Sequence, residues 1–227
     1  MSEIVSFSQK SLFARLQAVR IPKSLSFDEQ YNFANDPHPE IRYLLVSRPD
    51  TTEFILKTLK DNNKKIRDAI NKHPIIKRIL RKIQANEFSF DDQYELAHHW
   101  NPLVRITLAY SVHTPQEILE ALVFDEEIKT RIALVLNINT PENTLMQLTK
   151  DTSQQVRINL ARRRDISDNI LKVLLEDSSP KVLRQLLLVH RNKLSKLLKS
   201  NHIGELVGLN NIQSDSLDVL FLQKIVQ

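Results

Sequence analysis

The chain has no cysteine and very little glycine. Without cysteine in its 227 residues, disulfides and thiolate metal sites are excluded, and the composition fits a reducing compartment. Two glycines are too few for nucleotide-binding loops or hairpin-rich β folds, because both need positive φ or close backbone approach. Helices need neither, so the composition favours an all-α protein.

Long apolar runs are missing as well. No run approaches the ~20 residues that span a bilayer, and the first residues lack the charged and then apolar segment of a secretory signal. We therefore expect a cytoplasmic protein without membrane insertion. The net charge of +5 favours an acidic partner, whether nucleic acid, anionic membrane or acidic protein surface, although the excess is modest for this length.

What the sequence does contain is a repeated pattern of Asp, four residues, a β-branched residue and Arg. Successive copies are 26 residues apart from Arg105 to Arg131 and from Arg131 to Arg157, and 25 apart from Arg42 to Arg67. A fixed step of this size indicates one supersecondary unit stacked on copies of itself. The copies are Asp36 with Arg42, Asp61 with Arg67, His99 with Arg105, Asp125 with Arg131, Asp151 with Arg157 and, without the arginine, Asp177 with Leu183.

Each repeat is predicted to hold two short helices. Asn101 followed by Pro102 is typical of an N-cap and first helical position, because proline there gives up a hydrogen bond that it could not make. Nine residues after the arginine, Thr114 with Glu117 has a capping-box pattern and predicts the second helix. Equivalent first starts are His38, Asn63, Glu127, Ser153 and Ser179, and equivalent second starts are Thr51, Thr140 and, more weakly, Ser167.

A short sequence segment is repeated in the two halves of the chain. Residues 26–31 return as residues 89–94 at an offset of 63, and each copy opens with a serine three residues ahead of an acid. This spacing predicts capping boxes that begin at Ser26 and Ser89. The extra length between the second and third repeats is therefore predicted to be an added helix rather than a loop.

We expect one elongated repeat domain that covers residues 1–227. A capping helix occupies residues 1–25, about six repeats occupy residues 26–190, and a C-terminal cap occupies residues 191–227, with a helix near 216–226. End caps are required because a terminal repeat would otherwise expose its stacking face.

One stretch of the chain has a recognisable family pattern. It runs through Leu96, Ala97, Asn101, Pro102, Leu103, Val104, Arg105, Ile106, Leu108, Ala109, Thr114, Pro115, Ile118, Leu119 and Leu122. This pattern resembles the variant leucine-rich repeat (LRV), a relative of the HEAT and armadillo repeats. The resemblance implies a right-handed α-solenoid with a binding or scaffolding role and no single ligand. His99 and Trp100 replace the usual Asp, and Leu183 replaces the usual Arg.

The recurring arginines lie in the first turn of their helices, where the helix dipole disfavours a positive charge by some tenths of a kcal/mol. Either the recurring Asp compensates them, or they line a groove for an anionic ligand. Because Asp recurs together with Arg, we favour a repeat-stabilising ladder. Its members are Arg42, Arg67, Arg105, Arg131, Arg157, Asp36, Asp61, Asp125 and Asp151.

Four other residues are candidates for partner or anion contact: Arg162, Arg163, Arg164 and Trp100. A run of arginines at a helix end can face solvent or contact phosphates, and a large aromatic can pack between repeats or anchor a partner. A second basic set, which includes Lys77 and Arg81, has the same two interpretations.

No catalytic, cofactor-binding or metal site is predicted. His98, His99 and His113 are the only histidines worth testing as ligands, but adjacent helical residues point about 100° apart. We therefore predict a non-enzymatic protein-binding scaffold or adaptor, possibly within a larger bacterial assembly. The alternative is a nucleic-acid binder that contacts backbone phosphates. A DNA-glycosylase-like activity is least favoured, because the sole tryptophan, Trp100, has no defined carboxylate partner.

Overall fold

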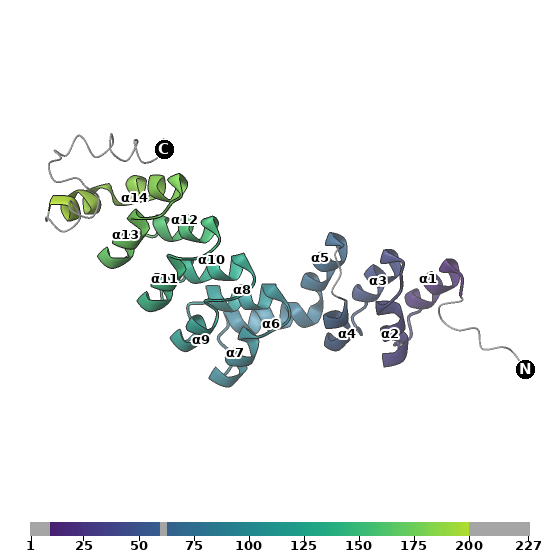
Figure 1. Ribbon diagram of the computed structural model, residues 1–227. Coiled ribbons are helices and arrows are strands. Elements are labelled where there is room, and N and C mark those ends of the chain that lie inside the picture. The colour runs from purple at the N-terminus through teal and green to yellow at the C-terminus, as the bar shows by residue number, and fades with distance from the viewer. Residues whose placement is uncertain (1–9, 60–62, 200–227) are drawn as a thin grey trace, which may run out of the picture. The chain divides into compact units, whose positions relative to one another are not determined.

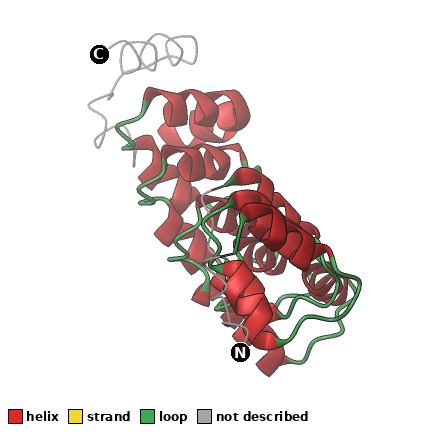
Figure 2. Ribbon diagram, turned by 90° about the vertical axis from the view of Figure 1, so that its right-hand side faces the viewer, coloured by secondary structure: helices red, strands yellow, loops and turns green. Residues whose placement is uncertain are grey.

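The computed structural model describes residues 10–59 and 63–199, apart from the side chains of residues 195–199. These residues contain 14 helices and no strand, which confirms the all-α prediction (Figure 2). The chain forms two compact units, Met1–Glu87 and Phe88–Gln227. Asp61 and the helix expected near 216–226 lie outside the described residues.

In the first unit, α1, α3 and α5 lie side by side, and α2 packs against both α3 and α4 (Figure 1). α6 follows α5 directly, since His73 ends α5 and is also the N-cap of α6. The helices are α1 (Leu12–Arg20), α2 (Phe27–Ala34), α3 (Pro39–Val46), α4 (Glu53–Thr58), α5 (Lys64–Lys72) and α6 (Pro74–Gln84). The predicted added helix is therefore confirmed as α6.

In the second unit, α8, α10, α12 and α14 form a row in which each helix contacts the next. α7, α11 and α13 pack against this row, and α9 packs against α7. α14 is interrupted by non-helical backbone at His190. The helices are α7 (Phe90–Ala97), α8 (Pro102–Tyr110), α9 (Gln116–Ala121), α10 (Ile128–Leu136), α11 (Glu142–Leu148), α12 (Gln154–Arg162), α13 (Asp168–Leu175) and α14 (Pro180–Lys199).

The first helix of each repeat begins where the sequence predicts. The N-caps of α3, α5, α8, α10 and α12 are His38, Asn63, Asn101, Glu127 and Ser153, and α14 starts at Pro180. Within these helices, apolar residues four positions apart are buried, including Ile41 with Leu45, Val104 with Leu108, and Val156 with Leu160. Each such side chain contributes about 1.5–3 kcal/mol when it leaves water.

The two predicted capping boxes are also confirmed. Ser26 accepts from the Glu29 N–H and the Glu29 carboxylate accepts from the Ser26 N–H, and Ser89 and Asp92 repeat the arrangement. The Ser26 N–H bond is the main reason that the pKa of Glu29 lies below its ordinary value. These boxes begin α2 and α7, which are the equivalent helices of the two units.

The predicted second caps at Thr114 and Thr140 are wrong. α9 and α11 begin after Pro115 and Pro141, and neither helix has a side-chain cap. The Thr114 hydroxyl instead donates backwards to the Leu108 carbonyl at 2.6 Å, and Thr140 donates to the Leu134 carbonyl at 2.6 Å. These buried hydroxyls add a second donor to carbonyls at the end of the preceding helix, which also accept from the Ser111 and Asn137 N–H groups. Thr51 donates to Leu45 in the same way, so Thr52 caps α4.

Candidate functional site

The recurring arginines of the second unit bind aspartates of the next repeat. The Arg131 Nε lies 2.6 Å from Asp151 Oδ2, and its Nη2 lies 3.0 Å from Oδ1. Arg105 makes the same two bonds to Asp125, at 2.6 and 3.1 Å. Arg157 repeats them with Asp177, at 2.6 and 3.3 Å. Such two-point pairing fixes the geometry of both side chains, so each pair holds one repeat against its neighbour.

The ladder residues of α10 and α12 are also bound within their own repeats. The Arg131 Nη1 donates to the Asp125 carbonyl at 2.6 Å, and Arg157 donates to the Asp151 carbonyl at 2.6 Å. The Asp151 carboxylate accepts from the Ser153 N–H at 2.7 Å, just ahead of α12. A single aspartate therefore orders the start of one helix and holds an arginine from the previous repeat.

The charged groups of the ladder pairs are buried, and this affects their pKa values. The aspartate side chains of the three pairs are only 4 to 5% exposed. The side-chain hydrogen bond to Asp125 raises the pKa of Arg105, against the opposing effect of burial, and Asp151 does the same for Arg131. A buried carboxylate of this kind requires its partner, because an unpaired buried charge is strongly unfavourable.

The ladder adapts where the sequence departs from the pattern. The His99 Nδ1 accepts from the Asn101 N–H at 3.0 Å, as the Asp carboxylates do, and the His99 carbonyl accepts from Arg105 at 2.8 Å. In the first unit, the buried Asp36 accepts from Arg15 of α1 at 2.7 Å, and the Asp36 carbonyl accepts from Arg42. The N-terminal helix thus supplies an arginine to the first complete repeat.

A second set of side chains links the repeats, which we call the clamp residues: Arg48, His73, Asn137 and Arg163. Each lies six residues after a ladder arginine and bonds to backbone carbonyls of the preceding repeat. Arg163 donates to the Val135 and Asn137 carbonyls at 2.8 and 2.7 Å. Because carbonyls at helix ends carry partial negative charge, a guanidinium suits this place.

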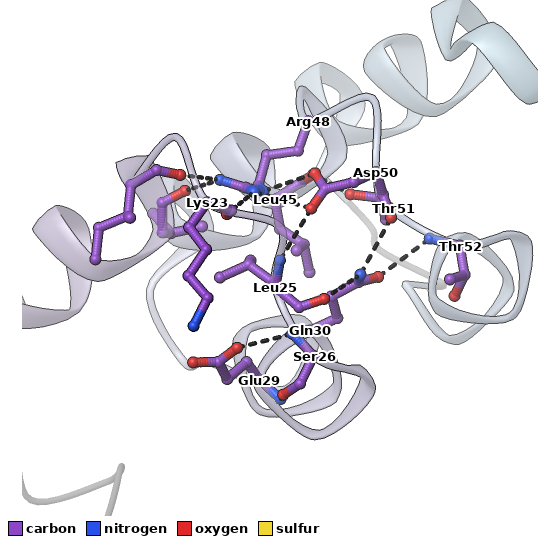
Figure 3. A network of polar contacts seen from close by, with 12 residues as sticks. Lys23, Leu25, Ser26, Glu29, Gln30, Leu45, Arg48, Asp50, Thr51 and Thr52 are labelled. Carbon is purple, nitrogen blue, oxygen red and sulfur yellow. Dashed lines mark hydrogen bonds and ion pairs between the residues drawn. The ribbon is translucent and has the colours of Figure 1, made fainter.

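Figure 3 shows the surroundings of the clamp residue Arg48. Arg48 reaches the carbonyls of Val19, Ile21 and Lys23, while its Nε donates to Asp50 at 2.9 Å. The Asp50 carboxylate also accepts from the Leu25 N–H, and the pKa of Asp50 is lowered chiefly by the Arg48 hydrogen bond. Arg163 with Asp165 is the same device in the second unit, and Arg163 is the main cause of the lowered pKa of Asp165.

The three consecutive arginines have different surroundings. The Arg163 side chain is 10% exposed and engaged as a clamp, whereas Arg162 and Arg164 are exposed. Arg162 donates to the Gln185 side chain at 3.0 Å. Sequence reasoning did not separate Arg163 from its neighbours. The sequence did contain a signal that marks Arg163: like Arg48, it is followed two residues later by an aspartate.

Trp100 is partly buried. Its ring stacks on His99, with centroids 5.3 Å apart and planes inclined by 29°. Trp100 therefore lies directly beside the ladder, since His99 takes the place of the aspartate there.

A group of exposed aromatic rings lies on α2 and α4. Phe27, Tyr31 and Phe54 are 51%, 46% and 56% exposed. The Phe27 ring lies 5.5 Å from Phe54 and 6.4 Å from Tyr31, so the three form one cluster. Their equivalents on α7, Phe90 and Tyr94, are 48% and 49% exposed. We call Phe27, Tyr31 and Phe54 the aromatic cluster.

Comparisons with known proteins return no relative: no family model, no curated protein and no solved structure matches the chain. Within residues 10–59 and 63–199, no three His, Asp or Glu side chains gather as metal ligands. In the same part of the chain, every helix is too short or too polar to cross a bilayer.

Proposed function

We propose that this protein is a cytoplasmic, non-enzymatic scaffold or adaptor that binds other proteins. In this proposal it is a right-handed α-solenoid with a period of about 26 residues, of the LRV type related to HEAT and armadillo repeats. Support comes from the row of successive helices in the second unit and from ladder pairs that each span 20 residues.

The aromatic cluster is the observation that carries the proposal. Three neighbouring rings, each about half exposed, form an apolar surface patch whose exposure to water is unfavourable. Such patches are typical of protein interfaces, where aromatic side chains supply much of the binding energy. The ladder arginines favour the same conclusion, because their carboxylate partners leave them neutralised rather than directed at an anionic ligand.

Affinity purification from the native cell tests this function. We expect a protein partner to co-purify with the wild type and to be lost from the double variant Phe27→Ala and Phe54→Ala. Phe124→Ala is the matched control, because Phe124 is 84% exposed and is not part of the cluster. Purified partner should then bind the wild type in a fixed stoichiometry. Equal retention by both variants would argue against the aromatic cluster as the binding surface.

A further inference from the structure

The positive charge of this chain is concentrated in one short segment. Residues 64–82 carry eight Lys or Arg and a single acid, Asp68, so their excess is larger than the +5 of the whole chain. This segment comprises α5 and most of α6. Apart from ladder residue Arg67, its exposed cations are Lys64, Lys65, Lys72, Lys77, Arg78, Arg81 and Lys82, which we call the α5–α6 basic surface.

Three open hollows lie along this surface and adjoin one another. The first is lined by Lys65, Lys72 and the acid Asp68, among others, and includes Pro74. The second also includes Pro74 and is lined by Lys77 and Arg81. The third shares Arg81 with the second and adds Arg78, Lys82 and one acid, Glu87. The cations therefore border one continuous strip rather than separate points.

We propose that the α5–α6 basic surface binds the phosphate backbone of a nucleic acid duplex. The 11 residues of α6 span about 16 Å, and a duplex presents about one negative charge per 1.7 Å of its axis. The four cations of this helix lie between residues 77 and 82, within about 8 Å along the helix axis, and match a short row of phosphates. Because lysine and arginine contact phosphates without regard to base, such binding is largely independent of sequence.

Other polyanions fit this surface less well. An amphipathic helix lying on a membrane needs a free apolar face, but α6 buries Ile76 and Ile83 in the protein. Single-stranded nucleic acid needs aromatic rings for base stacking, and residues 64–84 contain no Phe, Tyr or Trp. Tyr43 borders the first hollow, but the Lys65 ammonium lies over its ring, 4.7 Å from the centroid. An acidic protein segment is a less suitable ligand, because this surface offers few of the apolar and aromatic contacts that anchor most protein interfaces.

Fluorescence anisotropy with the full chain and a labelled duplex of about 20 base pairs tests the proposal. For four phosphate contacts, affinity should fall on the order of 100-fold between about 50 and 200 mM salt. The triple variant Lys77→Gln, Arg78→Gln and Arg81→Gln should bind at least about tenfold more weakly at low salt, with a salt slope reduced by about 2.7. Parallel DNA and RNA duplexes distinguish the two sources of phosphate backbone.

The control removes the same charge from the second unit through Lys129→Gln, Lys150→Gln and Arg164→Gln, all at exposed positions. It should keep wild-type affinity, and circular dichroism should show native helix content in both triple variants. Absence of binding at low salt, or equal losses in the two triple variants, would overturn the proposal. So would tighter binding of polyglutamate or anionic vesicles through the same three residues. The proposal is independent of the scaffold function, since Phe27→Ala with Phe54→Ala should leave duplex binding intact.

Discussion

The ladder arginines of the second unit and the cations of α5 and α6 in the first unit carry the same charge in different surroundings. Arg105, Arg131 and Arg157 each meet a buried aspartate from the next repeat. Lys77, Arg81 and their neighbours line open hollows on a segment with a single acid. The same residue type thus stabilises repeats in one place and lines an exposed surface in the other.

This difference separates stability from binding. A paired, buried cation contributes to folding through its hydrogen bonds, whereas an exposed cation contributes little to folding because water already solvates it. Substitutions in the two sets should therefore affect different measurements. The first two predictions use neighbouring residues as controls, so each tests the surroundings while the residue type stays nearly constant.

The largest effect is expected at Asp125. Asp125→Ala leaves Arg105 buried without its main partner and removes the acceptor of the Glu127 N–H, so the free energy of unfolding should fall by about 3 kcal/mol. Glu126 contacts the same arginine at 3.3 Å, but its side chain is 87% exposed. Glu126→Ala should cost no more than about 0.5 kcal/mol. Urea unfolding followed by circular dichroism gives both values, and equal losses would contradict the ladder's role.

An intermediate effect is expected in the arginine triplet. Arg163→Ala removes the guanidinium from the Val135 and Asn137 carbonyls, of which the second still accepts from the Thr140 N–H, and this should cost about 2 kcal/mol. Arg164→Ala, at the exposed neighbouring position, should change the free energy of unfolding by about 0.5 kcal/mol or less. The same urea experiment measures the pair. A similar small loss in both variants would show that the clamp does not stabilise the stack.

The smallest effect is a pH dependence at the clamp residue His73. Its Nε2 lies 3.1 Å from the Arg48 carbonyl and its Nδ1 accepts from the Ile75 N–H, an arrangement that requires neutral imidazole. Burial lowers the pKa of His73 below 6.5, and burial likewise lowers that of His190. Above about pH 7 the imidazoles are neutral in both states, so their contribution is fully present.

As the pH falls through 6.5, the unfolded chain takes up protons that the folded chain resists, so stability should decrease. His73→Asn, which places at this position the residue found at clamp position 137, should make the decrease shallower. His113→Asn, at an exposed histidine, is the control. Thermal unfolding at about pH 7.5, 6.5 and 5.5 measures the slope, and an unchanged slope in His73→Asn would refute the assignment.

Local features of the fold could be predicted from the sequence. The starts at Asn101 and Ser153, the capping box at Ser89 and the buried positions Val104 and Leu108 all depend on residues within one or two helical turns. Because helix caps and apolar faces are set by neighbours in the chain, their spacing identified them. The wrong assignments at Thr114 and Thr140 show the limit, since a hydroxyl can bond either forwards or backwards.

By itself, the sequence determined an all-α chain, the register of its first helices and the recurrence of arginine with aspartate. Only the tertiary structure decided that Arg131 binds Asp151, 20 residues later, rather than Asp125 of its own repeat, whose carbonyl it also contacts. It likewise decided that Arg163 is a clamp while Arg164 faces solvent. The reason is physical: helix formation depends on nearby residues, but the partner of a long cationic side chain depends on which repeat packs beside it.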